Sequence, residues 1–231
     1  MLILSIFCLP LAAAEVVVFD HYDTTMTYKD GTLQVSKQLR LKNIGDNPII
    51  PGEIHFKISK EQKGASVAPT IENFKVTDKF GKELDTRQFA TDKEVDLVFT
   101  VWDPLLPEFF YDMTMSYELD FKPKGVLFYQ VALPEERTTI PIKSASTTFK
   151  LPKRYHITYL RPAEGETQTS ADGMSAVTWD EKTSYDVEYS VIPFPRLGFK
   201  AVNMFWILII ILFLINLFFR MKKKAQMARS V

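Results

Sequence analysis

Cysteine is nearly absent from the 231-residue chain. The one cysteine, Cys8, lies in an apolar leader. The rest of the chain therefore cannot form a disulfide, a thiolate zinc site or a thiol nucleophile. A domain without disulfides must be stabilised by its hydrophobic core. The stretch from Glu15 to Lys200 is long enough for one large core or two small ones.

Recognisable catalytic motifs are also missing. The sequence contains no Gly-x-Ser-x-Gly elbow, phosphate loop, His-Glu-x-x-His or calcium loop. The histidines, His21, His55 and His156, have no metal-ligand spacing. We therefore expect no catalytic residue, no metal and no cofactor, and a protein that is not an enzyme. Carboxylates from distant strands could still converge, so the alternative is a membrane-tethered hydrolase acting on an extracellular polymer such as glycan.

Excess positive charge is missing from the part of the chain that could fold. The whole chain carries 28 basic and 28 acidic residues, but residues 15–200 hold 23 basic and all 28 acidic ones, a net charge of −5. This balance disfavours nucleic acid or an anionic lipid surface as a partner. No Asn-x-Ser/Thr sequon is present. Together with the missing disulfides, this favours a prokaryotic surface protein.

One long apolar run dominates the remainder. Residues 201–219 contain no charge, and as a helix they span about 29 Å, close to the hydrocarbon thickness of a bilayer. The basic residues that follow are Arg220, Lys222, Lys223 and Lys224. Basic residues flank transmembrane helices on the cytoplasmic side. We therefore expect a type I single-pass protein of the cell membrane, with the N-terminal domain outside, residues 220–231 in the cytoplasm and the lipid bilayer as a partner.

Two amides interrupt the apolar run. Asn203 and Asn216 are thirteen positions apart, about 220° around the helix, so they do not form one polar stripe. Each lies close to an end of the run, where an amide can reach headgroups. We expect the helix to act chiefly as an anchor, with pairing to another helix as the alternative.

The first fourteen residues resemble a secretory signal. They are apolar and end in small residues, so cleavage is expected between Ala14 and Glu15. The alternative is an uncleaved anchor, although fourteen helical residues span only about 21 Å.

The stretch between leader and apolar run alternates between apolar and polar residues. This period of two is typical of half-buried strands. Within each segment, the residues that we expect to face inward share one parity. They are Met26 and Tyr28 in the first segment, Leu33, Val35, Leu39 and Leu41 in the second, and Ile50, Ile54, Phe56 and Ile58 in the third. Asp30-Gly31 lies between two such segments and predicts a hairpin turn. The pattern continues through 71–76, 94–102 and 109–121.

This pattern predicts an all-β, antiparallel β-sandwich that is Ig-like in general form, followed by one transmembrane helix. Lys122-Pro123-Lys124-Gly125 is the expected boundary between a module at 15–121 and a smaller one at 122–192. Strands in the second module are expected at 126–133, 140–142, 145–151, 155–160, 176–179 and 185–191. The alternative is a single large sandwich. Residues 193–200 hold two prolines and predict a short, stiff linker to the membrane.

Four large apolar residues surround two prolines in the loop before residue 110. They are Leu105, Leu106, Phe109 and Phe110. Exposed, such a group marks a partner site; the alternative is that it closes one end of the sandwich. With the anchor and the short tail, this predicts a domain that acts by contact. It would be an accessory or scaffolding subunit of a membrane complex, or a surface-binding module, with another membrane or surface protein as partner. A sensor acting through a partner helix is a further alternative.

Overall fold

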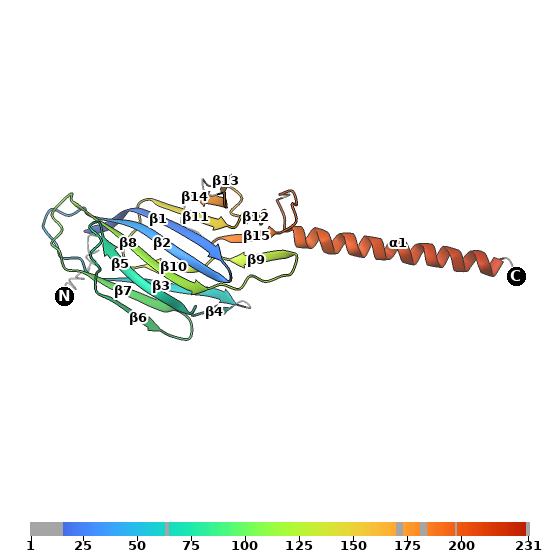
Figure 1. The fold of residues 1–231 in the computed structure, drawn as a ribbon, viewed down its shortest axis with the longest axis horizontal. Helices are drawn as coiled ribbons and strands as arrows, with labels where there is room; N and C mark the ends of the chain where they lie inside the picture. The colour runs from blue at the N-terminus through green and yellow to red at the C-terminus, as the bar shows by residue number, and fades with distance from the viewer. Residues whose placement is uncertain (1–15, 63–64, 170–172, 181–183, 197, 230–231) are drawn as a thin grey trace, which may run out of the picture.

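The computed structural model describes residues 16–62, 65–169, 173–180, 184–196 and 198–229. The leader and its expected cleavage at Ala14 and Glu15 lie outside these residues. Within them, fifteen β-strands precede one helix, α1 (Ala201–Arg229). Figure 1 shows the helix leaving the β domain at the end opposite the start of the first strand. The predicted β-sandwich plus one C-terminal apolar helix is confirmed.

A seven-stranded sheet forms one layer of the domain. Its strands, in spatial order, are β13 (Glu166–Thr169), β14 (Ser175–Trp179), β11 (Ala145–Leu151), β1 (Val17–Lys29), β2 (Thr32–Asn43), β8 (Phe110–Asp120) and β5 (Ile71–Asp78). The pairing of β1 with β11 is parallel, whereas the other pairings in this sheet are antiparallel. The sandwich is therefore not purely antiparallel.

Two smaller sheets pack against that layer. One has the order β10 (Glu135–Thr138), β3 (Gly52–Gln62), β7 (Val95–Val101) and β6 (Thr86–Ala90), and β4 (Ala65–Val67) also pairs with β3. The other has the order β12 (His156–Arg161), β15 (Asp186–Ser190) and β9 (Phe128–Ala132). Phe19 of β1 contacts Phe56 of β3, and Tyr28 of β1 contacts Tyr189 of β15, with ring centroids 5.8 and 6.1 Å apart. Both small sheets thus share the core of the large one.

The β1–β2 hairpin follows the sequence pattern closely. Asp30 and Gly31 both have positive φ, 48° and 90°, as a tight hairpin turn requires. The strands remain paired from Lys29–Thr32 to Val17–Asn43. The inward positions of β2 are almost fully buried, as expected for Leu33, Val35, Leu39 and Leu41.

Other local predictions were wrong. Ile50 is 57% exposed, because β3 begins only at Gly52, where a φ of 72° turns the backbone. The parity of Ile54, Phe56 and Ile58, which are buried, therefore does not extend back to Ile50. Residues 140–142 form an isolated bridge between Ile142 and Phe19 in place of a strand.

Strands from both sides of Lys122 pair with one another. β11 pairs with β1 and β10 pairs with β3, and one hydrophobic cluster includes residues from both sides. These contacts favour the alternative of one large sandwich. The modules 15–121 and 122–192, and the Ig-like form, stay predictions.

The helix α1 continues beyond the expected end at Phe219 to Arg229. Residues 220–229 are arginine, lysine, methionine, alanine and glutamine, which are all good helix formers. No glycine or proline in this segment ends the helix. Residues Ala201–Lys222 are long and apolar enough to span a membrane. Both Asn203 and Asn216 lie on this stretch, and both residues are exposed.

Candidate functional site at the end of the sandwich opposite the helix

Asn43, the last residue of β2, holds together two loops at this end. Its side chain is fully buried. The Nδ2 group donates to the carbonyl oxygens of Asn47 (2.8 Å) and Leu105 (2.9 Å), and Oδ1 accepts from the amide of Gly45 (2.9 Å). Its backbone bonds to Glu108 and Phe109. One side chain thus fixes loop 44–51 against loop 102–109.

The predicted partner residues lie on the second of these loops and at the first residue of β8. Leu105 is buried, at 3% exposure, and closes the end of the core. Leu106, Phe109 and Phe110 are 45, 61 and 46% exposed. The four residues therefore divide between the two roles that the sequence left open: one side chain seals the sandwich and three face outward.

Further apolar side chains on the same loops are exposed. We define the distal patch as Ile44, Ile50, Trp102, Leu106, Phe109 and Phe110. An amide–carbonyl pair between Ile49 and Leu105 joins the loops beneath it, with N···O distances of 3.1 and 2.8 Å. Exposed apolar groups that gather on one end of a domain are typical of an interaction surface.

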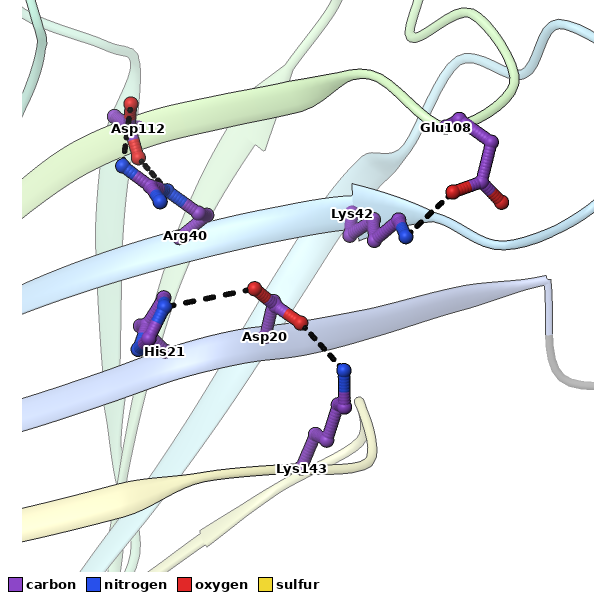
Figure 2. Close-up of polar contacts among 7 residues, drawn as sticks. All are labelled: Asp20, His21, Arg40, Lys42, Glu108, Asp112 and Lys143. Carbon is purple, nitrogen blue, oxygen red and sulfur yellow. Dashed lines mark hydrogen bonds and ion pairs between the residues drawn. The ribbon is translucent and has the colours of Figure 1, made fainter.

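Ion pairs cover the outer face of β1, β2 and β8 beside this patch (Figure 2). Arg40 bonds Asp112 with Nε···Oδ1 at 2.6 Å and Nη2···Oδ2 at 3.4 Å. Lys42 Nζ lies 2.6 Å from Glu108 Oε2. The guanidinium of Arg40 and the ammonium of Lys42 lie 5.2 and 5.5 Å from the ring of Phe110. These cations therefore link the charged face to the patch.

A second group lies on β1 in the same view. Asp20 accepts a hydrogen bond from Lys143 Nζ at 3.1 Å, and His21 Nε2 lies 3.6 Å from its other oxygen. The Lys143 hydrogen bond lowers the pKa of Asp20 below its ordinary 3.8. The bond to Asp112 raises the pKa of Arg40. Asp20 and Arg40 are therefore charged throughout the neutral range.

A hollow of about 420 Å³ opens between these groups on the large sheet. His21, Asp23, Gln38, Arg40, Lys79 and Asp112 are among its lining residues. Its mixed charge suits polar groups of a partner at the margin of the distal patch.

A buried ion pair that was not predicted from the sequence lies between the layers. Lys37 Nζ of β2 lies 2.7 Å from Glu136 Oε2 of β10, and the two side chains are 2 and 7% exposed. Lys37 also donates to Thr24 Oγ1 at 3.0 Å. The sequence did hold a signal, since Lys37 occupies the inward parity between Val35 and Leu39. Its partner Glu136 is 99 positions away, and the sequence around Glu136 does not indicate that its side chain is buried.

The remaining candidate ligands lie apart from one another. His55 Nδ1 is 3.0 Å from Asp96 Oδ2, on the polar face of β3 and β7. Among the residues that the structure describes, no three histidine, cysteine, aspartate or glutamate side chains gather as a metal site would need. The expectation that the chain is not an enzyme, and the hydrolase alternative, stay predictions.

No family model and no curated protein matches the chain. Solved structures that resemble it include the M1 zinc metallopeptidase from Deinococcus radiodurans, at 13% identity and a TM-score of 0.43, covering 76% of this chain and 42% of that one. A mutant of that enzyme bound to a Tyr-Ser-Ala substrate gives 14% identity and a TM-score of 0.44, covering 75% and 42%. The chain thus spans less than half of these structures, and a likeness this low carries no argument about activity.

Proposed function

We propose that this chain is a membrane-anchored β-sandwich protein that binds a protein partner through its distal patch, as an accessory or scaffolding subunit of a membrane complex. The observation that carries the proposal is the distal patch itself. Five of its six apolar side chains lie on the two loops that Asn43 fixes and the sixth, Phe110, begins β8, at the end of the domain away from an apolar helix.

The composition of this end favours a protein over other partners. Aromatic side chains and arginine are enriched at protein interfaces. The patch contains Trp102, Phe109 and Phe110, and the guanidinium of Arg40 lies 5.2 Å from the ring centroid of Phe110. Charged pairs at its margin resemble the polar rim of such an interface. The net charge of −5 argues against nucleic acid.

The orientation follows from the charges at the ends of the apolar run. Arg220, Lys222, Lys223 and Lys224 would keep the C-terminal side in the cytoplasm. The β domain then lies outside, with the distal patch facing away from its own membrane.

Crosslinking in intact cells tests the proposal. A photoreactive residue replaces Phe109 in one variant and Phe89, which is 55% exposed on the edge strand β6, in a matched control. The expected result is a stoichiometric membrane or surface protein captured at position 109 and not at position 89. The substitution Phe109→Ser should abolish recovery of that protein in mild detergent, while Phe89→Ser should retain it. A chain that is monomeric, with no crosslink at position 109, would refute the proposal.

A further inference from the structure

The first turn of α1 is packed against the β domain. The carboxylate of Glu188 in β15 is fully buried and accepts hydrogen bonds from the amides of Ala201 (2.6 Å) and Val202 (3.4 Å) and from Thr158 Oγ1 (2.8 Å). A carboxylate at this position satisfies the free amides of a helix start and complements its dipole. The place where the domain meets the helix is therefore defined.

Phe128, the first residue of β9, lies at this junction. Its ring centroid is 5.8 Å from that of Phe194 in the linker and 6.1 Å from that of Phe205 in α1. Phe205 is four residues into the helix, about 6 Å along its axis from Ala201. If residues 201–219 fill the hydrocarbon layer, Phe128 lies at the level where hydrocarbon meets headgroups.

The loop just before Phe128 combines two exposed apolar and two exposed basic side chains. Val126 is 82% and Leu127 44% exposed, and Lys122 and Lys124 precede them. Gly125 allows the loop to bend sharply, with a φ of 123°, because a Cβ there would lie 1.9 Å from the Phe128 carbonyl oxygen. We define residues 122–127 as the junction loop.

Two of the three carboxylates that line the surface hollow beside this loop form ion pairs within the chain, and the third is Glu61. Asp120 pairs with Lys60 at 2.9 Å and Asp186 pairs with Lys200 at 3.0 Å. All four residues line the same surface hollow as Lys122 and Lys124. Lys122 and Lys124 are exposed and belong to neither of these two ion pairs, so anions from outside the chain can reach them despite the negative charge of the domain as a whole.

We infer that the junction loop is a lipid-contacting element, in which Val126 and Leu127 enter the outer leaflet and Lys122 and Lys124 bind phospholipid phosphates. Burial of apolar side chains and attraction between lysine and anionic phosphate are the two terms that hold peripheral elements on bilayers. Val191, Ile192 and Phe199, which are 51, 51 and 45% exposed beside the same junction, extend the apolar contact. The inference rests on the membrane anchoring proposed above.

An environment-sensitive fluorophore tests this contact on the full chain in phosphatidylcholine vesicles. In a Cys8→Ser background the label is attached to Leu127→Cys. It is attached to Ile50→Cys as a water-exposed control and to Leu212→Cys as a control for helix insertion. We expect the label at 127 to be blue-shifted and quenched by lipids that carry a nitroxide near the headgroup, and the label at 50 to behave as in water.

The labels at positions 127, 50 and 212 distinguish the lipid contact of the junction loop from the membrane anchoring by α1. A water-like signal at 127 with a blue-shifted signal at 212 would overturn the lipid contact and leave the anchor standing. A water-like signal at 212 would overturn the anchor and the contact with it.

In a second experiment, Lys122→Gln combined with Lys124→Gln should weaken quenching at 127 in phosphatidylcholine vesicles but not in phosphate-free glycolipid vesicles. An unchanged signal in phosphatidylcholine would overturn the phosphate contact.

Discussion

Lys37 and Glu136 show how single residues tie the layers together. β2 belongs to the large sheet and β10 to a small one, and the charged groups of Lys37 and Glu136 meet in the buried interior between them. The Tyr117 hydroxyl also donates to Glu136 Oε2 at 3.4 Å, and burial raises the pKa of Tyr117. The Lys37–Glu136 pair therefore specifies which part of β10 faces β2.

Removing one member of this pair should cost more than removing both. Lys37→Met removes the ammonium group that lies 2.7 Å from the buried Glu136 carboxylate, which should lower the free energy of unfolding by about 3–5 kcal/mol. The double variant Lys37→Met with Glu136→Leu should recover much of this loss. Urea unfolding of the full chain in nanodiscs, followed by tryptophan fluorescence, measures both. Additive effects of the two substitutions would contradict the coupling.

Asp20 gives the outer face a predictable pH dependence. Because Lys143 lowers the pKa of Asp20 in the folded chain below 3.8, the pair contributes stability above the unfolded pKa. That contribution is lost as the pH falls through the folded pKa. Asp20→Asn should therefore be less stable than the parent at neutral pH, and the difference should vanish in acid below the folded pKa. Thermal unfolding across this range tests it; Asp46→Asn, in an exposed loop, serves as a control.

At the scale of elements, the backbone conformation of the β1–β2 turn constrains which residues can occupy it. Gly31 has a φ of 90° and its carbonyl accepts from the amide of Phe121 at 2.9 Å. Gly31→Ala should destabilise the chain by about 1–2 kcal/mol, because a Cβ is disfavoured at positive φ. Asp30→Asn should be nearly neutral, since asparagine suits the first turn position. Chemical unfolding midpoints compare the two, and equal midpoints would refute the turn argument.

Elements were predictable where one face is buried and the pattern is long. β1, β2 and β8 meet this condition, whereas α1 was predictable from its long uncharged apolar run. Short strands such as β6, whose residues are mostly exposed, carry no such pattern and were missed. The parallel pairing of β1 with β11 joins residues more than a hundred positions apart, and local alternation holds no information on that partner.

The candidate site was predictable only in part for the same reason. The apolar loop before residue 110 stood out in the sequence, but Ile44 and Ile50 join it through hydrogen bonds from Asn43 to a residue 62 positions away. Ile50 was expected inside and belongs to the distal patch. The charges around Phe110 likewise come from β2, and only the register of β2 against β8 brings them there.

At the scale of the whole molecule, Glu188 fixes the domain to the helix. Glu188→Gln replaces one acceptor oxygen by an amino group that faces backbone amides, and the first turn of α1 should loosen. We expect a broader distance distribution between spin labels on β9 and on α1 in nanodiscs, measured by pulsed electron resonance. Thr158→Val, which removes only a donor to Glu188, should broaden it less. An unchanged distribution in Glu188→Gln would show that the other contacts suffice.

Because the junction is fixed, the length of the sandwich sets how far from the membrane the distal patch lies. β1 alone has thirteen residues and spans about 40 Å, and the distal patch lies at its far end. If the domain stands on the membrane as inferred, a neighbour anchored in the same bilayer must rise as far to touch the patch. Neighbouring proteins that extend less far from the bilayer would not reach the patch. The height of a protein above the membrane, as well as its surface chemistry, would therefore select the partner.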